Sequence, residues 1–296
     1  MRLTRRQLNR TLLRRQHLLE RADLDPVAMS AHLLGLQAQE SLSPYLSLAA
    51  RLHAFDPYDV TRALEERTLV RLLTMRGTLH LLTPDDALTL RPWTQPVLER
   101  AQRNHAEPVP QFARALVQAP PRGTWKGSGG VVYEPLEEWV GAPLREPDVP
   151  EIVRRYLRAY GPASAADVTT WSGVTRLAPV VAAMDDLVQH EDEDGRVLLD
   201  VPEGVLEDEG APAPVRLLGT YDNLWLAHAG RDRVTTAEKR RAWSGPNGGA
   251  GMVVLVDGML EGLWKPDDVQ LLRQLTKAES AQLDDEMARV EELFAR

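Results

Sequence analysis

The chain has 296 residues, 43% of them hydrophobic, which is enough for packed cores in one large domain or in two to three smaller ones. It contains no cysteine, so disulfides, thiolate metal sites and cysteine nucleophiles are excluded, and nothing indicates secretion. No window approaches the roughly 18 apolar residues of a membrane span, so we expect a cytoplasmic protein without a membrane partner.

Charge is divided unevenly along the chain, whose formal net charge is -8. Residues 1–120 carry 16 arginines against 12 acidic residues, a net of +4, and the remainder carries -12. A basic N-terminal half suits a polyphosphate partner such as DNA, and the alternative is a solvated helix face. The densest basic stretch contains Arg2, Arg5, Arg6, Arg10, Arg14, Arg15 and Arg21.

The first 82 residues predict helices followed by a hairpin. Pro44 follows Ser43 and Pro57 follows Asp56, which is typical of a capped helix with proline in its first turn. Two apolar runs then flank a turn at residues 75–77 and predict paired strands. This order of elements predicts a winged helix. The expected helices span about 4–21, 26–37, 44–53 and 57–66, and the expected strands span 69–74 and 78–82.

The pattern recurs in the second half of the chain. Helical periodicity at residues 149–160 and 175–188 precedes a hairpin with an Asp194-Gly195 turn, and a third hairpin turns at Asp257-Gly258. An amphipathic helix at about 277–295 closes the chain. We therefore predict an α+β, mostly helical fold of tandem winged-helix motifs with a C-terminal β-rich module. The expected domains are 1–106, a Pro- and Gly-rich linker at 107–147, 148–202 and 203–296, with a second linker at 245–251.

Four short motifs follow one another along the chain: Leu36-Gln37-Ala38-Gln39, residues 76–81 (RGTLHL), residues 221–224 (YDNL) and residues 256–258 (VDG). In this order the chain resembles the AlkZ-like DNA glycosylases. The resemblance implies tandem winged helices around a DNA-sized concavity and hydrolysis of the N-glycosidic bond of N7-alkylated purines in double-stranded DNA, with unhooking of cross-links by some members. It also implies that Gln37 and Gln39 position the catalytic water.

The spacing of the two glutamines sets a geometric condition. In a regular helix, residues i and i+2 project about 200° apart, so Gln37 and Gln39 could not hold one water there. The break at Ser41-Leu42-Ser43-Pro44 predicts Gln37 in a last helical turn and Gln39 beyond it. The alternative is two ordinary surface glutamines.

Other polar residues are candidates for DNA contact or chemistry. His80 alternates with Leu79 and Leu81, so we expect it to face DNA or the site unless it is structural. Asp222 is the reserve general base, with a helix cap or turn as its alternative. The expected backbone contacts, each with a solvated-face or turn alternative, are Arg5, Arg6, Arg10, Arg76, Arg231, Arg233, Arg240 and Arg241, with Lys239 in the last cluster.

Metal and amine chemistry are not expected. The seven histidines are scattered rather than set at ligand spacing, so we expect no metal and no cofactor. Lys126, Lys239, Lys265 and Lys277 all lie outside residues 1–106, which favours a monofunctional glycosylase. The competing functions are a winged-helix transcription regulator and, less favoured, a protein-interaction module working through the acidic half. Nothing in the sequence requires a dimer, and we expect a monomer.

Overall fold

The structure is a computed structural model that describes residues 1–243 and 251–296, so the linker expected at 245–251 lies almost entirely outside the described residues. The predicted N-terminal helices are present and begin within one residue of the expected positions, but the first ends at Arg15 instead of 21 and the second at His32 instead of 37. Asp25 and Asp56 cap two of them through their side chains, and Pro26 and Pro57 occupy the first turns. These helices are α1 (Arg5–Arg15), α2 (Pro26–His32), α3 (Ser43–Arg51) and α4 (Pro57–Glu65).

A five-stranded antiparallel sheet follows, in the order β1-β3-β2-β4-β5. The predicted hairpin forms β2 and β3, joined by the short 3-10 turn η1 (Met75–Gly77). The expectation of a linker at 107–147 is wrong, because this stretch supplies two strands that extend the sheet. The strands are β1 (Leu36–Gln37), β2 (Val70–Leu73), β3 (Leu79–Leu82), β4 (Leu116–Ala119) and β5 (Val132–Pro135), with α5 (Pro84–Trp93), α6 (Gln95–Gln102), α7 (Pro110–Ala113) and α8 (Leu136–Val140).

The remaining chain adds helices, a hairpin and a second sheet. The hairpins predicted at residues 194–195 and 257–258 are confirmed, whereas the helix expected at 175–188 is only five residues long. The second sheet has the order β11-β10-β9-β8. The elements are α9 (Val149–Tyr160), α10 (Ala165–Ser172), α11 (Ala178–Ala182), β6 (Val188–Glu191), β7 (Val197–Asp200), β8 (Arg216–Leu218), α12 (Asn223–Leu226), α13 (Ala237–Trp243), β9 (Met252–Val256), β10 (Met259–Lys265), β11 (Asp268–Leu271) and α14 (Lys277–Ala295).

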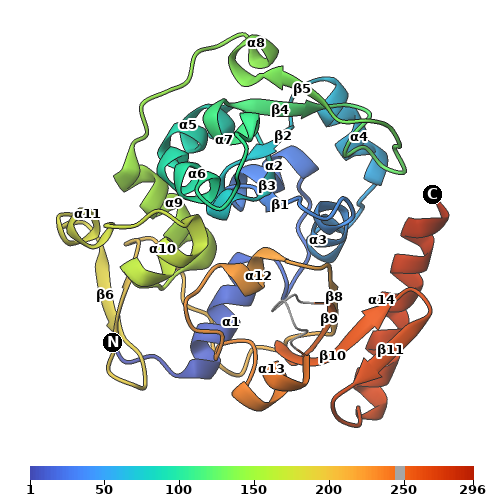
Figure 1. The fold of residues 1–296 in the computed structure, drawn as a ribbon. Coiled ribbons are helices and arrows are strands. Elements are labelled where there is room, and N and C mark those ends of the chain that lie inside the picture. Colours follow the sequence, from blue (N-terminus) through green and yellow to red (C-terminus); the bar gives the residue numbers. More distant parts are fainter. Residues whose placement is uncertain (244–250) are drawn as a thin grey trace.

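The hydrophobic core is shared by all parts of the chain. One cluster joins Leu12 of α1, Val70 of β2, Tyr156 of α9 and Leu218 of β8, so the predicted domains pack on one another. Helix α3 contacts both β1 and β8 and lies between the two sheets (Figure 1), while α14 packs against β8. The mixed, mostly helical fold class is confirmed; the winged-helix motifs remain a prediction. No described helix has the length and apolarity needed to cross a membrane.

Candidate functional site

Gln37 lies on a strand. Helix α2 ends at His32, and Leu34 and Gly35 turn the chain with φ angles of 54° and 93°. Gln37 then pairs with His80 of β3, and the Ala38 N–H donates to the Leu79 carbonyl at 2.8 Å. The expectation that Gln37 occupies a last helical turn is therefore wrong, because pairing with β3 makes this segment extended.

Strand β1 ends at Gln37, and Gln39 lies in the bend that follows it. Both side chains reach the start of β3, because Gln37 bonds Thr78 and Gln39 bonds the Leu79 N–H. Gln37 is only 7% exposed, its Nε2 donates to Thr78 Oγ1 at 3.4 Å, and its buried Oε1 has no hydrogen-bond partner among the described residues. Gln39 is exposed, and its Oε1 accepts from the Leu79 N–H at 3.3 Å. Gln37 thus offers its Oε1 as a free acceptor, and Gln39 offers its Nε2 as a free donor.

The peptide between the glutamines is held from the side by Arg71, which the sequence analysis missed. Arg71 of β2 is 3% exposed, and its Nη2 donates to the Ala38 carbonyl at 2.7 Å. Its Nη1 donates to Gln118 Oε1 on β4. A lone arginine inside the apolar run of residues 69–73 was the available signal, since a charge in a central strand needs a specific partner.

His80 and Arg76 form a buried pair beside Gln37. His80 is 1% exposed, so its predicted contact with DNA is wrong, although its strand register places it beside Gln37 as expected. Burial, helped by the charge of Arg76, lowers the pKa of His80 to about 3, so the ring is neutral. Arg76 donates to the Trp171 carbonyl and lies 3.2 Å from His80 Nε2. Its guanidinium turns inward, which corrects the prediction that it probes DNA from a free wing.

Asp222 is a structural residue. Both of its oxygens accept from Arg51 at 2.7 Å, Oδ2 also accepts from Ser47 Oγ, and Oδ1 caps α12 through the Leu224 N–H. Burial alone would raise the pKa of Asp222, but Arg51 and these bonds outweigh it and the pKa is lowered. A carboxylate with every acceptor occupied cannot take a proton from water, so the reserve role of general base is wrong and the cap is confirmed.

Two of the other quoted motifs meet the glutamine strand. Asn223 Nδ2 donates to the Gly35 carbonyl at 2.7 Å, just before β1. Ser43, which begins α3 after the Gln-x-Gln segment, donates to the Thr220 carbonyl at 2.6 Å. Residues 76–80 therefore contact Gln37 itself, while residues 220–223 hold the chain on either side of the Gln-x-Gln segment, at Gly35 and Ser43.

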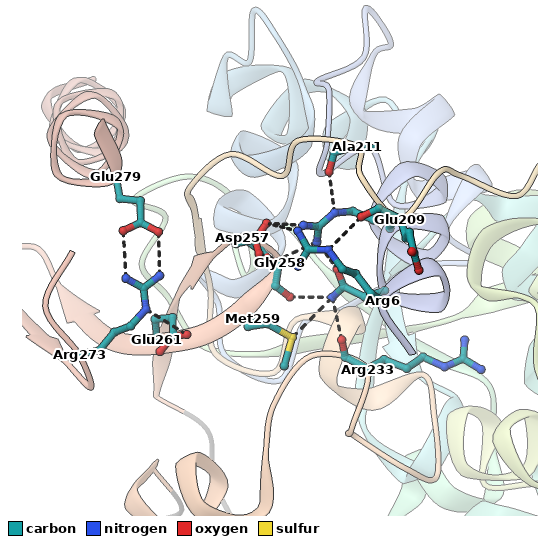
Figure 2. A network of polar contacts seen from close by, with 12 residues as sticks. Arg6, Glu209, Ala211, Arg233, Asp257, Gly258, Met259, Glu261, Arg273 and Glu279 are labelled. Atoms are coloured by element: carbon teal, nitrogen blue, oxygen red, sulfur yellow. Dashed lines mark hydrogen bonds and ion pairs between the residues drawn. The ribbon is translucent and has the colours of Figure 1, made fainter. Parts of the chain in front are cut away.

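The arginines of α1 are paired with acidic residues of the C-terminal half. Figure 2 shows Arg6 between Asp257, which it meets at 2.8 Å, and the Glu209 carbonyl. Arg10 is fully buried against Asp257, so its predicted DNA contact is wrong. The other pairs are Arg5 with Asp194 and Asp232, Arg14 with Glu207, Arg15 with Asp200 and Arg21 with Glu286.

The second predicted basic cluster is divided by the fold. Arg233 is 8% exposed and donates to the Pro162 carbonyl, which corrects its assignment to DNA. Lys239 pairs with Glu261 at 2.6 Å. Arg240 and Arg241 are exposed and Arg231 is half-buried, and their contact with DNA stays a prediction.

Residues 67–126 hold a large group of cations without a carboxylate partner among the described residues. This segment has nine cations and four acidic residues, and none of the nine forms a salt bridge with a described residue. Two of the acids, Asp85 and Asp86, pair instead with Arg145 and Arg155 from outside it. The cations are Arg67, Arg71, Arg76, Arg91, Arg100, Arg103, Arg114, Arg122 and Lys126.

Comparison with known proteins gives three agreeing results. A family model described as DNA glycosylase AlkZ-like matches residues 30–114 and 109–293. A protein of Streptomyces sahachiroi named interstrand DNA cross-link repair glycosylase is 26% identical over 340 residues, 92% of this chain and 90% of that protein. The solved structure of the Streptomyces sahachiroi DNA glycosylase AlkZ has the same fold, with a TM-score of 0.79 and 22% identity over 99% of this chain and 97% of that one.

Proposed function

Because the chain belongs to the AlkZ-like family of DNA glycosylases, we propose that it excises N7-alkylated purines from double-stranded DNA, with Gln37 and Gln39 holding the attacking water. The observation that carries this proposal is the free Oε1 of Gln37. A buried amide oxygen without a partner is costly, and such groups gather where a ligand or water completes them.

Neutral amides are sufficient for this substrate. Alkylation at N7 makes the purine cationic, so cleavage of the C1′–N9 bond gives its electron pair to a base that leaves neutral. The water oxygen then bonds to C1′ and the water loses a proton. The enzyme has to orient water and tolerate an oxocarbenium-like sugar, which is a task of positioning.

Each glutamine has a separate role in holding the water. Gln37 Oε1 accepts a hydrogen bond from the water, because its Nε2 is already engaged with Thr78. Gln39 donates through Nε2, because its Oε1 is occupied by the Leu79 N–H. With no strong base at this position, uncharged bases leave far more slowly, and this favours damaged bases over normal ones.

The reaction ends with an abasic site rather than strand cleavage. Among the described residues neither glutamine is hydrogen-bonded to a lysine, and a bifunctional enzyme needs an amine nucleophile at the sugar. The name of the Streptomyces relative adds a second substrate. A cross-link through purine N7 atoms presents the same cationic leaving group, so we extend the proposal to unhooking.

The test is base release from defined duplexes. The protein is incubated with duplex DNA containing one N7-methylguanine, with a duplex cross-linked through two N7 atoms, and with the undamaged duplex. Hot alkali then converts abasic sites to strand breaks. We expect breaks at the methylated guanine and at the cross-link and none in undamaged DNA. Absence of breaks at both lesions contradicts the proposal.

A further inference from the structure

Arg71 lies at the peptide between the two glutamines, and Arg122 lies close enough to Arg71 for their charges to interact. Arg71 is bonded to the Ala38 carbonyl, and Gly123, the residue after Arg122, packs against it: a Cβ added at Gly123 would meet Arg71 Cδ at 3.0 Å and Nη1 at 3.8 Å. Neither arginine forms a salt bridge with a described residue. We call these two residues the Arg71–Arg122 pair.

The Arg71–Arg122 pair is short of negative charge. Arg122 Nε is buried and has no hydrogen-bond partner among the described residues. Burial and the charge of Arg122 lower the pKa of Arg71 to about 10, so Arg71 stays cationic at neutral pH. Burying a cation without a counterion is costly, and two adjacent cations add their repulsion. An anion at this position would relieve both effects.

Arg15 provides the contrast within the same molecule. It is buried to a similar degree, and its guanidinium meets Asp200 through two bonds of 2.7 and 2.8 Å. Arg15 therefore has a carboxylate counterion within the fold. At Arg71 the fold supplies only the amide oxygen of Gln118 and a backbone carbonyl, which leaves the charge available for a ligand.

The surroundings of the Arg71–Arg122 pair fit a phosphate. Tyr133 is 38% exposed and its hydroxyl accepts from Gln118 Nε2 at 3.3 Å, while Lys126 is exposed in the following turn. Arginine forks match the geometry of phosphate oxygens. No acidic residue lies between β4 and β5 to repel an anion, since residues 120–131 contain none.

We propose that Arg122 binds a backbone phosphate of the DNA strand next to the extruded nucleotide, with Arg71 as the second cation behind it. This rests on the proposed function, which places the damaged strand at Gln37 and Gln39. Arg71 is then a positioning residue: it connects the bound phosphate to the Ala38 carbonyl and so fixes the peptide between the two glutamines.

The test compares Arg122→Gln with a matched control, Arg154→Gln, which removes an arginine already paired with Asp186. Binding is measured on a duplex with a tetrahydrofuran abasic analogue, against salt, and with a neutral methylphosphonate at each of three phosphates on either side. We expect Arg122→Gln to weaken binding roughly five- to tenfold and to lower the salt slope by about one. At one of the six positions, the methylphosphonate should weaken DNA binding by the wild type and by the control equally. Binding by Arg122→Gln should not change at that position.

The phosphate site is overturned if Arg122→Gln binds as tightly as wild type with an unchanged salt slope. It is also overturned if each of the six methylphosphonates weakens binding by Arg122→Gln to the same extent. Arg71→Lys tests the second part: it keeps the charge, so binding should stay within about twofold, while the single-turnover rate falls because the bond to Ala38 is lost. A rate equal to wild type removes the positioning role. Because binding to the abasic analogue needs no catalysis, failure of base release with these binding effects intact counts against the glycosylase chemistry alone.

Discussion

Two arginine-rich regions of the molecule use their charge in opposite ways. On α1, arginines 5, 6, 10, 14 and 15 all meet carboxylates from residues 194–257, so a helix that is basic in sequence is neutralised in the fold. In residues 67–126, nine cations have no carboxylate partner in the part of the chain that the structure describes. Opposite charges in the two halves of a sequence can therefore mean internal ion pairing, and the surface available to DNA is the part that remains after these pairs are removed.

The largest expected effect breaks a buried pair of α1. Asp200→Ala leaves Arg15 buried without its carboxylate, and we expect a loss of about 3–5 kcal/mol in the free energy of unfolding. Urea denaturation at neutral pH measures this. Glu207→Ala is the control, because Arg14 is half exposed and its pair should contribute less than about 1 kcal/mol. Equal losses in the two variants would show that α1 is not held by its buried pairs.

The second-largest expected effect is a loss of stability in acid that arises from His80, within residues 67–126. His80 has a pKa lowered from 6.5 to about 3 in the folded chain, so the unfolded chain binds the proton first. The contribution of His80 to the free energy of unfolding is complete above pH 6.5. It falls by about 1.4 kcal/mol per pH unit as the pH drops towards 3. His80→Asn should reduce the slope between pH 6 and 4 by about one proton. An unchanged slope in urea denaturation would assign the loss to other groups, such as His228.

The smallest effect compares the two regions directly. Arg103, exposed at the end of α6, has no carboxylate partner among the described residues, whereas Arg14 is paired with Glu207. We expect Arg103→Gln to weaken binding to the abasic duplex roughly three- to fivefold and to lower the salt slope by about one. Arg14→Gln should stay within about twofold. A larger loss of binding in Arg14→Gln than in Arg103→Gln would indicate that DNA binds at α1.

The sequence predicted the elements whose signals are local. Pro44 and Pro57 located the starts of α3 and α4, the Asp-Gly turns located two hairpins, and the expected helix at 277–295 has the observed bounds of α14. Strand β1 was missed because two residues become a strand only by pairing with β3, more than forty residues later. Strands β4 and β5 were missed because proline and glycine between them looked like a linker.

The geometry expected for the candidate site was wrong, and the role of its two glutamines stays a proposal. Gln37 and Gln39 came from a resemblance, and the free Oε1 of Gln37 supports their proposed role. The errors at Arg10, Arg233 and Asp222 share one cause: their partners lie 71 to 247 residues away, so no local pattern could show that these charges are buried and paired. Arg71 was overlooked because it stood inside an apolar strand.

The most direct test of the proposed chemistry is single-turnover excision of N7-methylguanine by the Gln37→Ala, Gln39→Ala double variant. Gln270→Ala, on the exposed strand β11, is the matched control. We predict that the double variant binds the abasic duplex within about twofold of wild type but releases base at least about a hundredfold more slowly, since it loses groups that act on the water. Release at the wild-type rate with the fold intact would contradict the account.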